Sequence, residues 1–171
     1  MNLTRPFSTD EKIQALKELE VYGYTKASSY LKPEVLQTLL DETNKQYESI
    51  NKNGKVEYVG VPARDIDDKI LYNLQNKNKI YIDLLQSDFV RLIAMHKLND
   101  EYYRFLPKEV PNYTLQYYNA RSSGQKLDLH IDSYIPYLGD RCYIMQFAFC
   151  LEDHTPENGC TVVVPGSHKS G

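Results

Sequence analysis

Residues 127–132, with the sequence LDLHID, alternate apolar and polar side chains, which is the pattern of a half-buried β-strand. Residues two apart on a strand point to the same face, so His130 and Asp132 should project side by side. An imidazole and a carboxylate placed in this way supply two of the three ligands of a 2-His-1-carboxylate Fe(II) site. Taken alone, such a triplet is more often an ordinary polar strand face than a metal site, and the neighbouring segments, which also have strand patterns, favour the metal site.

The composition of the 171 residues is that of one ordinary globular domain, with 42% hydrophobic and 25% charged residues. The net charge is −3 and the sequence shows no basic stripe, so we expect no nucleic-acid partner. It contains no apolar run long enough for a membrane span, and the N-terminal residues lack the apolar core of a secretion signal. The three cysteines form no CxxC pair, which favours reduced thiols in a cytoplasmic protein.

The first part of the sequence is mainly helical in pattern. Ser8 and Glu11 have the spacing of a capping box, and Gly23 is placed to end the helix that they begin. A second helix should begin near Pro33, because proline suits the first helical turn. Two short helices are expected at 78–86 and 88–98, with Ser87 as the cap of the latter. Short strands are expected at 22–26 and 56–61.

The second part of the sequence is rich in strand formers. In addition to the strand that carries His130, we expect strands at 114–118, 142–151 and 160–164. Helices that precede strands in this way indicate an α+β fold. Residues 157–168, ENGCTVVVPGSH, have the pattern of a turn, a strand and a second turn, because Asn-Gly and Pro-Gly both favour tight turns. These residues by themselves indicate structure and no chemistry.

Together, the HID triplet at 130–132, the NGC triplet at 158–160 and the VPGSH run at 164–168 resemble the phytanoyl-CoA dioxygenase family of Fe(II)- and 2-oxoglutarate-dependent oxygenases. The N-terminal part also resembles that family, in YGY at 22–24 followed by LKPE at 31–34. The resemblance covers nearly the whole chain. It implies a double-stranded β-helix (jelly-roll, cupin-like) core with helices packed on one side. We therefore expect a single domain over 1–171, helical to about residue 110, with the start of the jelly roll at about 111–171.

The resemblance also implies a cofactor set of Fe(II), 2-oxoglutarate as co-substrate, and O2. His130 and Asp132 match the family's first two iron ligands, and the region of Gln116 and Tyr118 matches a wall of the 2-oxoglutarate pocket. The implied activity is hydroxylation of a small organic or acyl substrate with release of succinate and CO2.

Three further residues match positions that line the substrate cavity in this family. Ser133 follows the ligand pair and would face the substrate, and Gln146 would line the same cavity. Ala148 stands where many relatives have tryptophan, which implies a smaller wall at that point.

The family places its second iron histidine, and the arginine that pairs with 2-oxoglutarate, several tens of residues after the PGSH turn. This sequence stops at Gly171, so we expect it to be an incomplete piece of a longer enzyme and to bind Fe(II) weakly on its own. His154 and His168 are not favoured as the third ligand, and Arg121 and Arg141 do not match the family arginine.

Two alternatives remain open at this point. The first is a non-catalytic jelly-roll binding domain, or an inactive fragment that lacks the distal histidine and the arginine. A cupin-like isomerase with another metal is a weaker alternative, because cupin sites gather more histidines than this sequence offers near residue 130.

Overall fold

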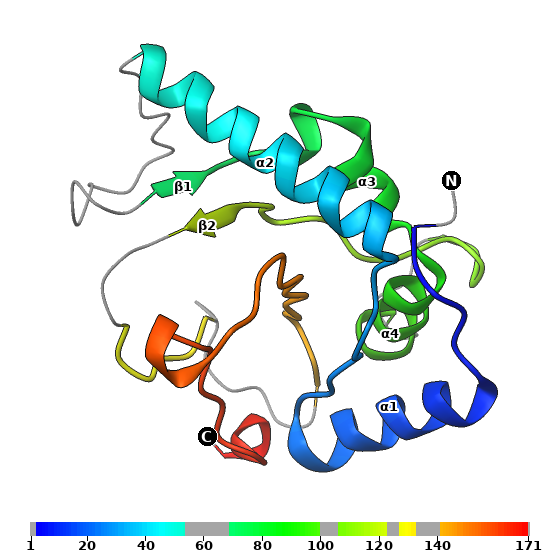
Figure 1. Cartoon of the computed structure of the whole chain (residues 1–171). Helices are drawn as coiled ribbons and strands as arrows, with labels where there is room; N and C mark the ends of the chain where they lie inside the picture. Colours follow the sequence, from blue (N-terminus) through cyan, green and yellow to red (C-terminus); the bar gives the residue numbers. More distant parts are fainter. Residues whose placement is uncertain (1–2, 54–68, 100–105, 123–126, 133–140, 171) are drawn as a thin grey trace.

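A computed structural model describes residues 3–53, 69–99, 106–122, 127–132 and 141–170 (Figure 1). The elements in chain order are α1 (Thr9–Tyr22), α2 (Pro33–Asn53), β1 (Lys69–Leu71), η1 (Leu74–Asn76), α3 (Lys79–Leu85), α4 (Asp88–Leu98), β2 (Ala120–Ser122), η2 (Pro156–Asn158) and η3 (Ser167–Lys169). The described chain is therefore α+β, as expected, with its α-helices in the first hundred residues. Within those ranges, no helix combines the length and the apolar character that crossing a membrane requires.

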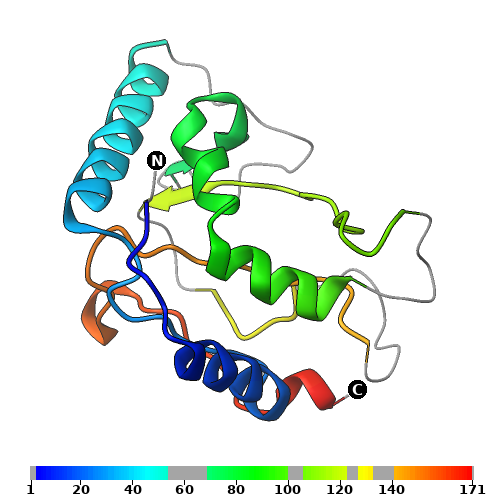
Figure 2. The same ribbon diagram turned by 90° about the vertical axis from the view of Figure 1, so that its right-hand side faces the viewer.

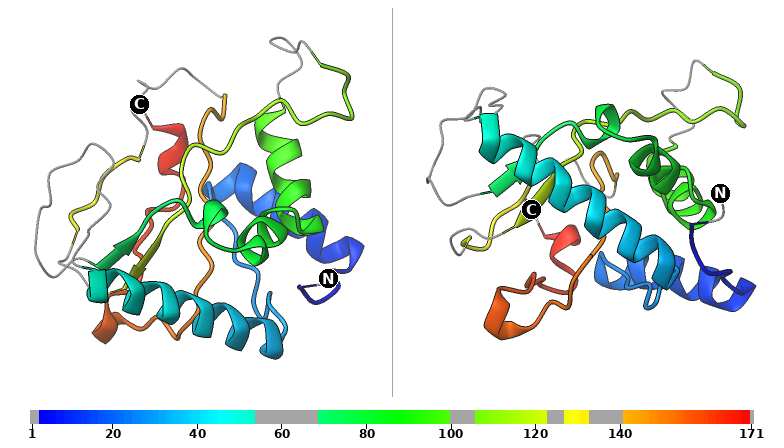
Figure 3. Two further views of the ribbon diagram at one scale, coloured as in Figure 1. Left: turned by 90° about the horizontal axis from the view of Figure 1, so that it is seen from above. Right: turned by 45° about the horizontal axis from the view of Figure 1, so that its top comes forward.

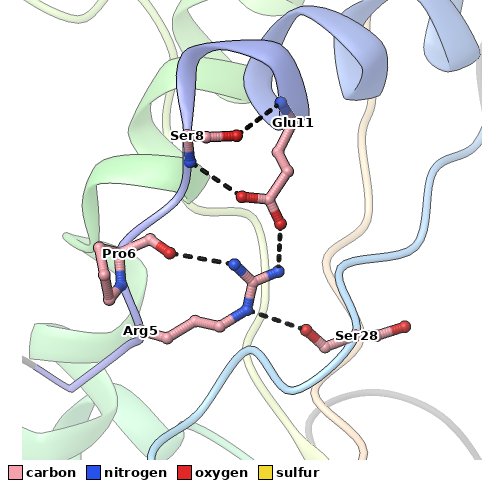
Figure 4. A network of polar contacts seen from close by, with 5 residues as sticks. All are labelled: Arg5, Pro6, Ser8, Glu11 and Ser28. Carbon is pink, nitrogen blue, oxygen red and sulfur yellow. Dashed lines mark hydrogen bonds and ion pairs between the residues drawn. The ribbon is translucent and has the colours of Figure 1, made fainter.

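The predicted start of α1 is confirmed in atomic detail. The Ser8 hydroxyl accepts a hydrogen bond from the Glu11 backbone N–H at 3.2 Å, and Glu11 Oε2 accepts one from the Ser8 N–H at 2.9 Å. Arg5 adds to this capping box, because its Nη2 donates to Glu11 Oε1 at 2.7 Å while its Nε donates to the Ser28 carbonyl at 3.2 Å (Figure 4). One guanidinium thus ties the start of the helix to the loop that follows the helix.

Glu11 should titrate well below an ordinary glutamate. The pKa of this carboxyl is lowered from 4.5 to about 2, first by the hydrogen bond from Arg5 and then by the Ser8 N–H. A lowered folded-state pKa means that the contribution to stability is present above about pH 4.5 and is lost as the pH falls toward 2. An NMR titration of the Glu11 side chain should show this. Arg5→Ala should raise the pKa more than Ser8→Ala, which keeps the backbone N–H; the reverse order would contradict the assignment.

The other three predicted helices are also confirmed. α2 begins at Pro33, and the helices expected at 78–86 and 88–98 are α3 and α4. Asn78 caps α3 by accepting a hydrogen bond from the Ile80 N–H at 3.1 Å. Ser87 holds the N-cap position of α4 but makes no side-chain capping bond there, because its hydroxyl donates to the Leu84 carbonyl at 2.7 Å.

Strand pairing in the described chain is limited to a two-stranded antiparallel sheet. β1 and β2 pair in the register Lys69↔Ser122, Ile70↔Arg121 and Leu71↔Ala120. The strand expected at 114–118 is not formed, and pairing begins two residues further on at Ala120. A jelly-roll core is therefore not seen in the part of the chain that the structure describes.

Four other expected strands are also absent from the described residues, at 22–26, 127–132, 142–151 and 160–164. A strand needs a neighbouring strand to take its backbone hydrogen bonds, and none of these segments has such a partner among the described residues. At 22–26 the reason is also local, since Tyr22 is the last residue of α1 and Gly23 caps the helix in a left-handed conformation. The strand expected at 56–61 lies outside the described residues.

Two apolar clusters form the core, and the segment 142–151 contacts both. The first joins α2, β1, η1 and α3 around Leu39, Leu71 and Leu84, and the second joins α1 and α4 around Leu19 and Ile93. Phe149 and Leu151 pack on the first cluster, whereas Met145 and Phe147 pack on the second. In Figures 1, 2 and 3 the orange part of the chain accordingly runs between α2 and α1.

This segment keeps the periodicity of a strand although it has no ladder. Its odd-numbered side chains from Met145 to Leu151 are half-buried against the helices. Gln146, Ala148 and Cys150 alternate with them and are exposed. The alternation directs the Gln146 side chain away from the core and toward Asp132.

Candidate functional site

His130 and Asp132 lie together even though no strand holds them. His130 Nε2 is 3.0 Å from Asp132 Oδ1. On the other side of the ring, Nδ1 lies 2.6 Å from the backbone carbonyl of Asp128. A carbonyl can only accept, so Nδ1 carries a proton and Nε2 is the ring atom turned toward the carboxylate. The Asp128 carbonyl, followed by the Asp132 carboxylate, raises the pKa of His130.

Two further side chains, Gln146 and Tyr117, extend this group through hydrogen bonds. Gln146 Nε2 donates a hydrogen bond to Asp132 Oδ2 and another to the Tyr117 hydroxyl, the latter at 2.7 Å. The group thus combines side chains from three separate segments of the chain. All four side chains are exposed, and the His130 and Asp132 side chains are 51% and 43% accessible.

These side chains line an open cleft between the helices and the extended C-terminal segments. Leu39, Thr43 and Leu84 of the helical part also line it. The cleft measures about 2500 Å³, which is well above the range of about 300–1,000 Å³ that is usual for a closed small-molecule pocket. The described residues therefore form an accessible surface around the histidine and aspartate, and do not enclose a ligand.

The pair has suitable donors for two positions on a metal ion. His130 Nε2 and Asp132 Oδ1 lie 3.0 Å apart, which is the separation of a hydrogen bond between a protonated imidazole and a carboxylate. An imidazole nitrogen and a carboxylate oxygen are also the donor types of a non-heme Fe(II) site. Across the ranges that the structure describes, no group of three or more histidine, cysteine, aspartate or glutamate side chains is arranged to hold a metal.

The two residues expected at the 2-oxoglutarate pocket differ in their surroundings. Gln116 is exposed and lines the cleft. Tyr118 also borders the cleft but packs on the helical core, where it meets Tyr81 edge-to-face with ring centroids 6.0 Å apart, and burial raises its pKa. Tyr117 is the tyrosine that contacts the Gln146 amide, and no signal in the sequence distinguished it from its neighbours. The proposed roles of Gln116 and Tyr118 stay predictions.

Among the three residues expected to line the substrate cavity, Ser133 lies outside the described residues, and Gln146 is exposed and donates a hydrogen bond to Asp132. Ala148 is exposed on the same side of its segment as Gln146. His154 is exposed and lines the same cleft, as does Arg141.

The PGSH turn docks on the C-terminal end of α1. The Gly166 N–H donates to the Tyr22 carbonyl at 2.8 Å, and His168 Nε2 lies 3.3 Å from the Glu20 carbonyl. The imidazole covers Gly23 so closely that a Cβ atom there would lie 2.4 Å from His168 Nδ1. His168 is not among the residues that line the cleft, so its contacts in this structure are with the helix end.

The comparisons with known proteins extend these observations. A sequence model of the phytanoyl-CoA dioxygenase family matches residues 19–171, which is most of the chain. A search of curated proteins and a search of solved structures each found no match. The matched region contains the His130–Asp132 pair, the 142–151 segment and the PGSH turn.

Proposed function

Because the chain belongs to the phytanoyl-CoA dioxygenase family, whose members are generally oxygenases, we propose that it acts as an Fe(II)- and 2-oxoglutarate-dependent dioxygenase. The proposed reaction converts a substrate C–H bond to C–OH, while 2-oxoglutarate and O2 yield succinate and CO2. One oxygen atom of O2 enters the product and the other enters succinate. The observation that supports this proposal best is the contact between His130 Nε2 and Asp132 Oδ1 on an open cleft, within the matched region.

In this proposal, His130 and Asp132 hold the iron through Nε2 and Oδ1. The hydrogen bond from His130 Nδ1–H to the Asp128 carbonyl orients the ring and keeps Nε2 available as a ligand. Bound Fe(II) would supply the O2 chemistry, which side chains alone cannot provide. We assign 2-oxoglutarate to the wall near Gln116 and Tyr118, and the substrate, a small organic or acyl molecule, to the side of Ser133 and Gln146. The third ligand and the arginine would come from outside the described residues.

The test uses the protein as its gene encodes it. Under anaerobic conditions, 2-oxoglutarate should add a visible charge-transfer absorption to the Fe(II)-loaded protein. Admission of O2 should then release succinate in proportion to the 2-oxoglutarate consumed, and a chelator should stop the release. Absence of both the absorption and the succinate would refute the proposal.

If the protein binds a small molecule equally well after Asp132→Ala and never forms succinate, a non-catalytic binding domain becomes the better description.

A further inference from the structure

Gln146 connects Asp132 to Tyr117. The Asp132 carboxylate can only accept hydrogen bonds, so the Gln146 atom that faces Oδ2 must be the amide nitrogen, as the structure has it. The same nitrogen has a second N–H, which is directed to the Tyr117 hydroxyl at 2.7 Å. Both amide protons are therefore used, and the amide plane is fixed at two points.

The two oxygens of Asp132 consequently have different surroundings. Oδ1 lies 3.0 Å from His130 Nε2, whereas Oδ2 accepts the hydrogen bond from Gln146. Rotation of the carboxylate to offer both oxygens to one ion would move Oδ2 from the position in which it accepts the Gln146 hydrogen bond. The arrangement thus favours a carboxylate that presents a single oxygen on the side of the histidine.

The backbone that carries Gln146 is anchored on both sides. Met145 and Phe147 pack on the cluster formed by α1 and α4, so the side chain between them is directed to the cleft. A ligand whose partner is supported by packed neighbours is held more precisely than one supported by a free loop.

We propose that Gln146 is a positioning residue that holds Asp132 as a one-oxygen metal ligand, and that Tyr117 fixes Gln146 in turn. This inference rests on the proposed function, because it assumes that His130 and Asp132 bind the metal. It assigns to Gln146 a role toward the metal site that is separate from contact with a substrate.

The inference is tested with Co(II) as the probe, titrated into the metal-free protein as its gene encodes it, with visible absorption as the readout. Gln146→Met keeps the size of the side chain and removes both N–H donors. It should weaken Co(II) binding by about tenfold to a hundredfold, as is typical when a hydrogen-bond partner of a ligand is removed. It should also change the Co(II) spectrum, because the carboxylate is then free to bind through both oxygens. Tyr117→Phe should have a smaller effect in the same direction.

Asn119→Ala is the matched control, since Asn119 is another exposed amide that lines the same cleft. It should leave both affinity and spectrum unchanged. If Gln146→Met also leaves both unchanged while Asp132→Ala abolishes binding, the positioning role is wrong and the proposed function stands. If Asp132→Ala leaves Co(II) binding unchanged as well, the proposed function fails together with the inference.

Discussion

Replacement of Gly23 by alanine should destabilise the fold by about 2–3 kcal/mol. Gly23 caps α1 with φ of 81°, and the left-handed conformation costs an alanine about 1–2 kcal/mol. The new Cβ would also lie 2.4 Å from His168 Nδ1, so the imidazole must move and give up its contact with the Glu20 carbonyl. The loss of one such hydrogen bond adds about 1 kcal/mol. Urea denaturation would measure the change in the free energy of unfolding.

Two controls separate the conformational cost from the clash. Gly159 has nearly the same φ, 85°, but has nothing within 4 Å of the position that a Cβ would take. Gly159→Ala should therefore cost only the conformational part. In a His168→Ala background, Gly23→Ala should likewise lose part of its effect, because a double-mutant cycle reports the contact between the two residues. Equal costs at both glycines, together with strict additivity in the cycle, would show that the imidazole does not restrict position 23.

The elements that could be predicted from the sequence depend on signals within one or two helical turns. Ser8 and Glu11 satisfy each other's backbone and side-chain groups across three residues, so the start of α1 is visible without knowledge of the rest of the chain. The same holds for Pro33 at the start of α2 and for Gly23 at the end of α1. Such signals identify the helices, and these are the elements that the structure confirms.

The strands could not be predicted in the same way, because a strand is completed by a partner strand that is often distant in the sequence. Segment 142–151, predicted as a strand, packs its odd-numbered side chains from Met145 to Leu151 inward, but among the described residues no strand pairs with it. Conversely, the expected contact between His130 and Asp132 forms without a strand, supported by the Asp128 carbonyl and Gln146. The alternation at 127–132 correctly indicated that His130 and Asp132 lie side by side. The strand that was expected to hold them there is not formed.

Contacts between residues that are far apart in the sequence could not be predicted either. The sequence identified PGSH as a turn, but its docking partner, the end of α1, precedes it by more than 140 residues. It also favoured Tyr118 over Tyr117 near the site. Only the packing of Tyr118 on Tyr81 and the bond from Gln146 to Tyr117 show that the two tyrosines have different surroundings.

The second large effect concerns the ligand pair itself. His130→Ala and Asp132→Ala should each weaken binding of Fe(II) by more than about a hundredfold, since losses of this order already follow from removal of residues that merely support a ligand. Anaerobic calorimetry with the protein as its gene encodes it would measure the affinity. Both side chains are about half exposed, so their truncation should leave the thermal unfolding of the metal-free protein nearly unchanged.

The neighbouring residues Asp153 and His154 provide the matched controls for this prediction. They offer the same chemical groups, are exposed and line the same cleft, but no contact joins their side chains to Asp132 or His130 in the described structure. Asp153→Ala and His154→Ala should therefore leave Fe(II) affinity unchanged. A loss of affinity in Asp153→Ala and His154→Ala, with affinity unchanged in His130→Ala and Asp132→Ala, would mean that the metal is bound at residues 153 and 154 instead. The 3.0 Å contact between His130 and Asp132 would then be a surface ion pair and nothing more.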